Sequence, residues 1–317
     1  MLSDTVILAG IICAIATFFL GLFAKPICAK FGLMDIPDAR KQHKITTPLA
    51  GGLALTLIIV PLAILLILFA TPASSQPTLM VWLGATAAMA ILGMADDRHT
   101  LAARDRLLVS LLIFASAAVF DPMFNVRVLT FEHPLFELGL GTGFLAIIFT
   151  TICGVGLVNA VNMADGKNGL VIGLCIGWLS LLALRAPQPL LPIIFLLVAA
   201  LFILLVFNLC GRLFLGDGGA YGLATAIGLI AIITYNTKGD HAGRAISADE
   251  LVLLFAVPVI DSFRLTFARV SRGRSPMAAD RDHLHHHLLD LVGWPRGLFV
   301  YLFLAIAPPA LLFVLDA

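Results

Sequence analysis

The chain has 317 residues, of which 60% are hydrophobic and 12% are charged, with a formal net charge of +1. A typical soluble domain is about half apolar and about a quarter charged, so a soluble globular protein is excluded. Disordered chains, disulfide scaffolds and outer-membrane barrels are excluded as well, because barrel strands alternate apolar and polar residues. Each membrane-spanning helix uses roughly 20 apolar residues. The composition therefore predicts an all-α polytopic membrane protein with a single domain, residues 1–317.

Ten apolar segments predict about ten transmembrane helices, the first of them uncleaved, at about 5–23, 51–70, 79–94, 107–120, 144–162, 169–184, 190–208, 219–235, 250–267 and 298–315. Sixteen of the 20 Lys and Arg residues then fall in loops on one side of the membrane. The positive-inside rule assigns that side to the cytoplasm. Both termini are therefore predicted to be periplasmic, and every notable polar cluster faces the cytoplasm.

The first cytoplasmic loop reads GLMDIPDARKQHKITTPLAGG and contains Asp35, Arg40, Lys41 and His43. Basic residues beside a membrane helix are attracted to anionic lipid head groups, and this is the simpler interpretation of the loop by itself. The same side chains are candidates for binding a substrate phosphate.

Asp96 and Asp97 end the third predicted span. Two adjacent carboxylates repel each other unless a cation or a proton joins them. Taken alone, the pair is also typical of an ordinary acidic helix end beside several arginines.

The fifth predicted span ends with Gly156, Asn159, Asn162 and Asp165, which recur every three residues and form a ridge on one side of a helix. Amides and a carboxylate that faced lipid would be unpaired, so the ridge is predicted to face a polar cleft. Hydrogen bonding between helices is the alternative interpretation.

Asp217 lies between glycines, where we expect it directly before a helix. Exposed backbone N–H groups and the positive end of the helix dipole attract phosphate at such a position, and the carboxylate is suited to magnesium. A plain helix cap followed by small residues that allow close helix packing is the alternative.

The ninth predicted span carries Asp261 and Arg264, three residues apart, which predicts an ion pair acting as a structural strut. A loop rich in cations and imidazoles follows, with Arg281, His283 and the run 285–287. Three adjacent histidines suit a tetrahedral zinc site poorly. Groups that grip a diphosphate are the better interpretation.

Taken in order, DIPDARKQH with the later GG, DDR at 96–98, NAVNMADGKNGL, FLGDGGAYG and DRDHLHHHL resemble the polyprenyl-phosphate N-acetylhexosamine-1-phosphate transferases. The resemblance covers about residues 32–290, and the first loop is more similar to the WecA-like branch than to the MraY-like branch. It implies about ten or eleven transmembrane helices, magnesium and a cytoplasmic active-site cleft open to lipid. Asn168 and Ala220 depart from the common motifs, which more often carry Asp and Ser there.

The resemblance also implies residue roles. Asp217 and Asp165 would hold Mg²⁺, for which Mn²⁺ is an accepted substitute, and Asp96 and Asp97 would be catalytic, acting on a phosphate. The remaining candidates would bind substrate: Arg40, Lys41, His43, Asn162, Arg281, His283, His285 and His286.

The implied reaction transfers HexNAc-1-phosphate, with GlcNAc the first choice of sugar, from a UDP-sugar to undecaprenyl phosphate in the bacterial inner membrane. It releases UMP and starts cell-envelope polysaccharide synthesis, of the O-antigen, common-antigen or teichoic-acid-linkage type. No nucleic-acid partner is expected, and a homodimer is a candidate assembly. The alternatives are an MraY-like phospho-MurNAc-pentapeptide transferase and, from another class, a lipid or sugar transporter, although transporters place their polar sites near the bilayer midplane.

Overall fold

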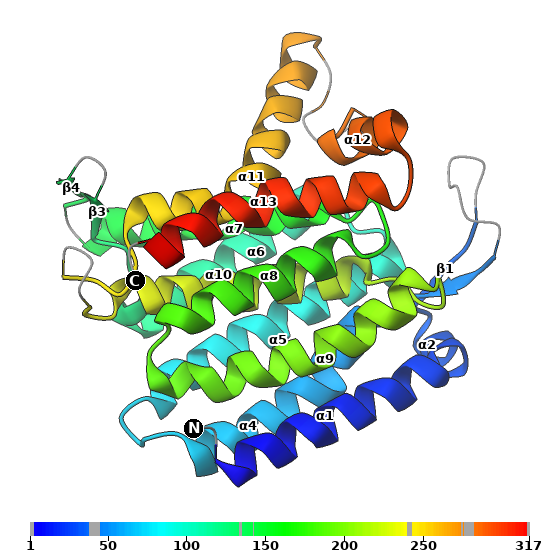
Figure 1. Cartoon of the computed structure of the whole chain (residues 1–317), viewed down its shortest axis with the longest axis horizontal. Coiled ribbons are helices and arrows are strands. Elements are labelled where there is room, and N and C mark those ends of the chain that lie inside the picture. The colour runs from blue at the N-terminus through cyan, green and yellow to red at the C-terminus, as the bar shows by residue number, and fades with distance from the viewer. Residues whose placement is uncertain are drawn as a thin grey trace.

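The computed structural model describes residues 3–37, 45–132, 135–141, 143–239, 243–273, 275 and 282–315, and its framework is helical (Figure 1). The α-helices are α1 (Asp4–Leu22), α2 (Ala24–Phe31), α3 (Gly51–Ala54), α4 (Val60–Ala70), α5 (Gln76–His99), α6 (Ala103–Phe120), α7 (Gly143–Ala164), α8 (Leu170–Arg185), α9 (Leu191–Leu209), α10 (Gly216–Asn236), α11 (Ala248–Ser271), α12 (Leu284–Val292) and α13 (Arg296–Leu315). A π-helical turn, η1 (Leu55–Ile59), joins α3 to α4, and short 3₁₀ turns, η2 (Pro122–Phe124) and η3 (Gln188–Leu190), precede β3 and α9.

Eight helical segments of the described chain are long and apolar enough to cross a membrane. The other two predicted spans coincide with α6, which has three charged residues in its first turn, and with α8, which has only 16 residues. The prediction of an all-α polytopic membrane protein is therefore confirmed, while ten crossings stay a prediction. Helix α1 begins and α13 ends at the same end of the bundle (Figure 1), as an even number of crossings requires.

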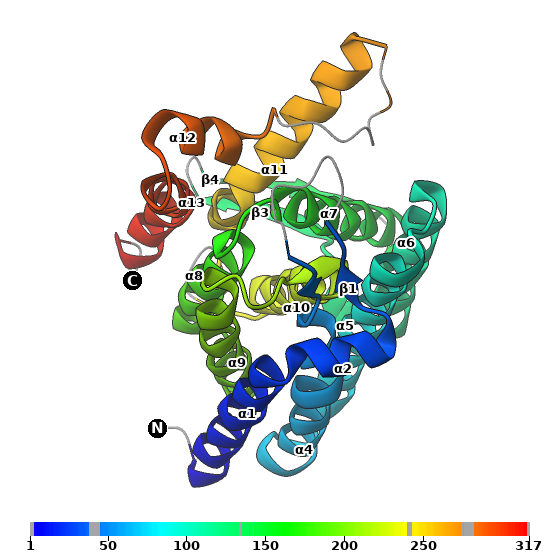
Figure 2. The ribbon, with the colours of Figure 1, turned by 90° about the vertical axis from the view of Figure 1, so that its right-hand side faces the viewer.

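Helix α10 lies at the centre of the bundle, with the other long helices around it (Figure 2). Its sequence is apolar or small on every side, and every residue from Gly218 to Tyr235 is buried. Glycines allow the close approach of its neighbours. A Cβ atom on Gly93 of α5 would lie 2.3 Å from the carbonyl oxygen of Asp217 and 2.6 Å from the Cα atom of Gly218.

In the described part of the chain, two small antiparallel sheets that were not predicted from the sequence interrupt the helices. Strands β1 (Met34–Asp35) and β2 (Thr47–Pro48) pair at one end of the bundle. Strands β3 (Val128–Glu132) and β4 (Leu135–Gly139) pair at the other end, where plain loop was expected. Strands of two residues are too short to produce an alternating pattern, and the β3–β4 hairpin is held by cross-strand contacts such as the stacked rings of Phe131 and Phe136.

The segment after β2 connects the first loop to the start of α10. The N–H of Phe214 donates to the carbonyl of Pro48 (2.9 Å), and the N–H of Gly51 donates to the carbonyl of Leu215 (3.1 Å). The conspicuous P-x-x-G-G sequence is therefore the piece of chain that docks the first loop beside Gly216. A Cβ atom on Gly51 would lie 2.4 Å from the Leu215 carbonyl oxygen, so this approach requires glycine.

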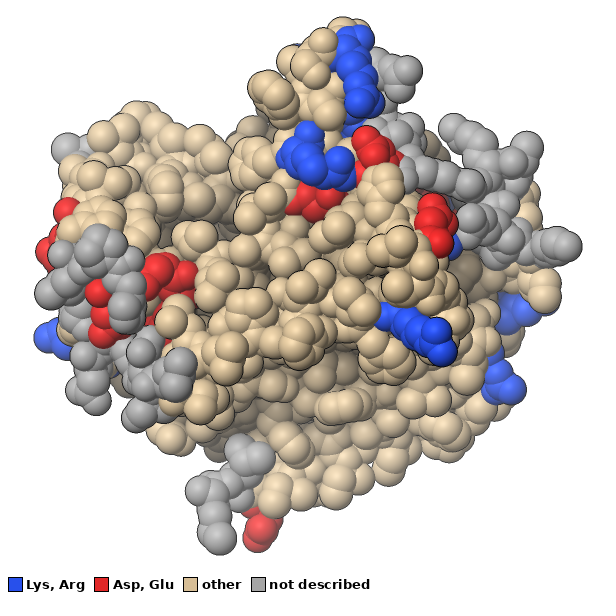
Figure 3. Space-filling model, turned by 45° about the horizontal axis from the view of Figure 1, so that its top comes forward, with Lys and Arg blue, Asp and Glu red and all other residues tan. Residues whose placement is uncertain are grey.

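Basic side chains gather at one end of the molecule. In Figure 3, Lys and Arg side chains are seen toward the right-hand end and on the projecting end of α11, uncharged residues occupy most of the middle of this face, and acidic residues are prominent at the left. The projecting end of α11 stands away from the bundle (Figures 1 and 2) and exposes Phe263 and Phe267. This charge distribution is the one on which the predicted orientation depends.

Candidate functional site

The two acids at the end of α5 have different partners. Oδ2 of Asp96 accepts hydrogen bonds from the guanidinium Nη1 of Arg106 (2.6 Å) and from the hydroxyl of Tyr221 (3.2 Å), and Oδ1 accepts one from the backbone N–H of Leu101 (2.8 Å). Arg106 also donates to the Tyr221 oxygen (3.3 Å). Asp96 is buried, and its carboxylate therefore links α5, α6 and α10.

Asp97 binds the beginning of α10. Its Oδ1 accepts the N–H of Asp217 (2.9 Å) and its Oδ2 accepts the N–H of Gly218 (3.0 Å). The expectation that Asp217 precedes the helix with free amides for phosphate is therefore wrong. Gly216, with a φ of +72°, turns the chain so that the helix begins one residue before Asp217, and Asp97 binds two of the backbone amides of its first turn.

Four carboxylates from three separate parts of the sequence converge at this point. Asp217 interacts electrostatically with Asp96, Asp97 and Asp165, and the side chains of Asp217 and Asp96 are within hydrogen-bonding reach. Asp165 follows α7 in a tight turn, and burial followed by the charge of Asp97 raises its pKa to about 7. The charge of Asp35, on β1, also acts on Asp97. The cluster thus brings four carboxyl groups so close together that the ionisation of one disfavours the ionisation of the others.

Such a cluster suits a divalent cation that is also bound by substrate. In the described part of the chain, no three His, Cys, Asp or Glu side chains have the geometry to hold a metal ion by themselves. Magnesium, however, is usually bound through one or two carboxylates together with substrate phosphates and water. The mutual repulsion of Asp96, Asp97, Asp165 and Asp217 therefore fits an ion that arrives with a phosphate ligand.

The polar ridge of α7 faces the same region. Asn159 lines a small recess together with Arg106, Ser110 and Tyr221, as expected for a ridge that faces a polar cleft. Its amide also donates to the carbonyl of its own helix at Val155 (2.8 Å). Gly156, one turn earlier, is exposed, and no described heavy atom lies within 4 Å of a Cβ built on it.

The histidines of α12 lie against the Asp165 turn. A Cβ atom on Gly166 would lie 2.4 Å from Nε2 of His285, so the imidazole packs directly on this glycine. The His285 ring is 5.3 Å from that of His283 and 4.3 Å from that of His286, centroid to centroid. His285 is buried, and neither of its ring nitrogens has a hydrogen-bond partner among the described residues. Buried polar atoms without partners are candidates for contact with a ligand.

Comparisons with known proteins show which family and which proteins this chain resembles. The model of glycosyl transferase family 4 matches residues 79–235, which contain all four clustered carboxylates. The chain is therefore similar to members of this family over this segment. It is similar to the undecaprenyl-phosphate alpha-N-acetylglucosaminyl 1-phosphate transferases of Yersinia pestis (28% identity, covering 92% of this chain and 79% of the relative) and of Escherichia coli K12 (28%, covering 92% and 78%). A probable undecaprenyl-phosphate N-acetylglucosaminyl 1-phosphate transferase of Bacillus subtilis is 26% identical, covering 90% and 77%.

The match to the model of glycosyl transferase family 4 and the similarity to these relatives confirm the resemblance drawn from the motifs. Of the site residues it implied, Asp96, Asp97, Asp165 and Asp217 converge, and His285 packs on the turn that carries Asp165. Asn162, His283 and His286 lie in the adjoining elements. The remaining four, Arg40, Lys41, His43 and Arg281, fall outside the described residues.

Sequence reasoning missed Arg106 and Tyr221 as partners of Asp96. Tyr221 follows Asp217 by four residues, which places both on one face of α10. That spacing was a usable signal. For Arg106 no sequence pattern distinguished its role from that of an ordinary basic residue at the end of a membrane helix.

The burial of His285 predicts that the stability of the folded protein depends on pH. Burial, followed by the charges of His286 and His283, lowers the pKa of His285 to about 3. The unfolded chain binds a proton at this residue below about pH 6.5 while the folded chain does not, so stability is full above that pH and falls as the pH is lowered. We expect this one group to cost about 1.4 kcal/mol per pH unit below 6.5.

Thermal unfolding in detergent at pH 7.5 and pH 5.5 measures this effect. The His285→Gln variant should lose less stability than the wild type between these two pH values. Equal losses in the two proteins would contradict a buried, neutral His285.

Proposed function

We propose that this protein transfers N-acetylglucosamine 1-phosphate from UDP-N-acetylglucosamine to undecaprenyl phosphate and releases UMP. The observation that carries the proposal is the convergence of Asp96, Asp97, Asp165 and Asp217, next to a buried imidazole, at one end of a helical membrane bundle. The relatives named above are described as transferases of this kind. The reaction would start a cell-envelope polysaccharide.

In the proposed reaction, an oxygen of the lipid phosphate attacks the β-phosphorus of the UDP-sugar. The bond from that phosphorus to the oxygen bridging the α-phosphate breaks, and UMP leaves with the electron pair. The lipid phosphate is largely ionised at neutral pH, so a strong base is not needed. The main task of the protein is to align two anions and to offset their charge.

Asp217 and Asp165 are the proposed ligands of Mg²⁺, with Mn²⁺ as a substitute. The ion would supply positive charge that neutralises the phosphates. Asp97 fixes the first turn of α10 and so sets the position of Asp217. Asp96 sets the position of Arg106 through their ion pair. The Arg106 guanidinium borders the recess lined by Asn159 and provides a cation close to the carboxylates.

The imidazoles of His283, His285 and His286 and the amide of Asn162 are proposed to bind the sugar nucleotide. His285 suits this role because its two buried ring nitrogens have no partner in the described chain. The side chains of Arg40, Lys41, His43 and Arg281 are proposed to hold phosphate charge, since guanidinium and ammonium groups bind phosphate strongly.

The site is proposed to face the cytoplasm, with the protein in the bacterial inner membrane and its termini in the periplasm. Basic residues concentrate at the end of the bundle that carries β1, α2 and α12. The positive-inside rule assigns such an end to the cytoplasm, where UDP-sugars are available.

The decisive experiment supplies the purified protein with labelled UDP-N-acetylglucosamine and undecaprenyl phosphate, with and without magnesium. We expect label in the lipid extract, an equal amount of UMP, and loss of at least about 90% of both on chelation of the metal. Parallel reactions with UDP-MurNAc-pentapeptide and with other UDP-N-acetylhexosamines test the sugar. Label transfer only from the pentapeptide substrate, or no transfer from any UDP-sugar, would overturn the proposal.

A further inference from the structure

Asp261 lies in the apolar helix α11, where an ionised carboxylate is stable only if it is well paired. The expected ion pair within the helix is present. Arg264 donates to Oδ1 of Asp261 from Nε (3.2 Å) and from Nη2 (3.0 Å). This pair would be a sufficient strut by itself, but Asp261 has further partners that come from another part of the chain.

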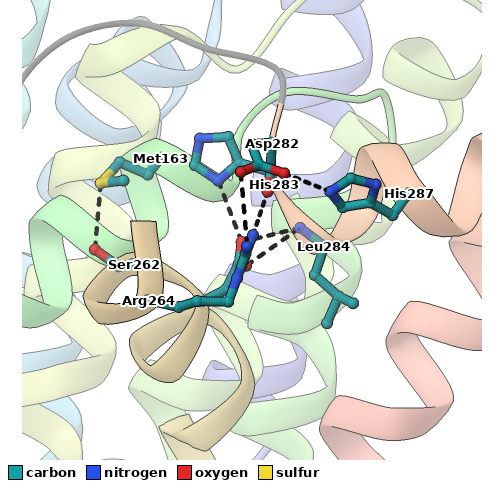
Figure 4. Close-up of polar contacts among 8 residues, drawn as sticks. Met163, Ser262, Arg264, Asp282, His283, Leu284 and His287 are labelled. Atoms are coloured by element: carbon teal, nitrogen blue, oxygen red, sulfur yellow. Dashed lines mark hydrogen bonds and ion pairs between the residues drawn. The ribbon is translucent and has the colours of Figure 1, made fainter. Parts of the chain in front are cut away.

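The additional partners belong to the start of α12 (Figure 4). Oδ2 of Asp261 lies 3.2 Å from Nδ1 of His283, and the backbone N–H of Leu284 donates to both carboxylate oxygens at 3.2 Å. Asp261 and His283 are both buried. A carboxylate only accepts hydrogen bonds, so it holds the proton of His283 on Nδ1 and leaves Nε2 for other contacts.

The neighbouring residue before His283 is held from the same helix. Arg264 donates to the backbone carbonyl of Asp282, and its Nη1 lies 3.9 Å from Oδ2 of that residue. Oδ1 of Asp282 is in turn 2.8 Å from Nε2 of His287. Asp261 and Arg264 together therefore fix three consecutive residues, 282–284, where the chain enters α12.

Fixing this entry determines where the next histidine lies. His285 is two residues beyond His283, and the two rings are nearly parallel, with an angle of 17° between them. His285 then packs on Gly166, beside Asp165. A shift of the first turn of α12 would move the imidazoles relative to the carboxylate cluster.

We propose that Asp261 is a positioning residue that holds His283 and the first turn of α12 against the Asp165–Gly166 turn, so that the imidazoles keep the geometry needed to bind the sugar nucleotide. This rests on the proposed function, and Asp261 acts through His283 without touching substrate. Groups that orient a functional histidine through its second nitrogen commonly have this kind of influence.

Asp261→Asn tests the proposal, with His283→Asn, the double variant and Ser262→Ala as comparisons. Ser262 is the next residue of α11 and its hydroxyl contacts Met163 instead of α12, which makes it a matched control. We expect Asp261→Asn to speed hydrogen–deuterium exchange of the peptide spanning 282–292 by at least about tenfold. Ser262→Ala should leave that exchange unchanged.

Kinetics of the same proteins show the functional consequence. We expect Asp261→Asn to lower kcat/KM for UDP-N-acetylglucosamine at least about tenfold, and to leave KM for undecaprenyl phosphate within about twofold of the wild type. The kcat/KM of the double variant should be no lower than that of the more damaged single variant, because both substitutions remove the same interaction between Asp261 and His283. A general loss of folding would instead change the kinetic constants for both substrates alike, and its effect would add to that of His283→Asn.

Wild-type exchange in Asp261→Asn, or fully additive kinetic effects, would overturn the positioning role. A failure of the proposed function is recognised separately, because the wild type would then release no UMP from any UDP-N-acetylhexosamine. In that case the exchange comparison still decides whether Asp261 holds α12: protection lost in the variant supports the assignment, and unchanged protection refutes it.

Discussion

Asp217→Asn is expected to lower UMP release from UDP-N-acetylglucosamine at least about a hundredfold, equivalent to about 2.7 kcal/mol of transition-state stabilisation. The substitution removes the carboxylate proposed to bind magnesium. It retains the backbone N–H that donates to Asp97, so the start of α10 should be unchanged. It also removes one of four mutually repelling carboxylates, and we therefore expect the thermal unfolding temperature to be equal to that of the wild type or higher.

The control for this prediction is Asp4→Asn, which makes the same chemical change at an exposed position in the first turn of α1. It should retain wild-type activity. If Asp217→Asn kept more than about a tenth of the activity, the assigned metal role would be wrong. A lower unfolding temperature would show instead that the cluster is stabilised as it stands.

The convergence of the acids was predictable because carboxylates are rare in and beside apolar membrane helices unless they share a polar environment. Asp96, Asp97 and Asp217 lie in or beside apolar helices, where an unpaired carboxylate is costly, so a shared polar environment was the economical explanation. Their individual partners were not predictable. Asp97 accepts hydrogen bonds from backbone amides of a helix that begins about 120 residues later. These bonds depend on the distance and the rotation at which α5 packs against α10.

Elsewhere in the chain, too, a local contact was predictable from the sequence and the non-local contacts were not. The Asp261–Arg264 pair follows from a spacing of three residues in a helix, and it was predicted. The contact of Asp261 with His283 depends on the path of the chain between α11 and α12, for which the sequence contains no periodic signal. The β1–β2 pair escaped prediction for a related reason, since its two-residue strands show no alternating pattern and the next residue, Leu49, pairs with the distant Phe214.

Two glycines of α5 show how packing and chemistry are coupled in this fold. Gly93→Ala is expected to destabilise the protein by about 1–3 kcal/mol, because the new methyl group would overlap the backbone of α10, which cannot move aside as a flexible side chain can. Gly84, two and a half turns earlier on the same helix, has no described heavy atom within 4 Å of a built Cβ. Gly84→Ala should therefore be neutral, or stabilising by up to about 1 kcal/mol.

The same pair separates the effects on activity. Asp96 and Asp97 follow Gly93 by about one helical turn. A displacement of α5 from α10 at Gly93 would therefore separate these carboxylates from Asp217. We expect Gly93→Ala to reduce transfer of N-acetylglucosamine 1-phosphate at least about tenfold at a temperature where it remains folded, and Gly84→Ala to retain full activity. Thermal unfolding in detergent and the labelled-transfer assay measure the two quantities. Equal behaviour of the two variants would mean that the close contact of α5 with α10 does not set the geometry of the carboxylate cluster.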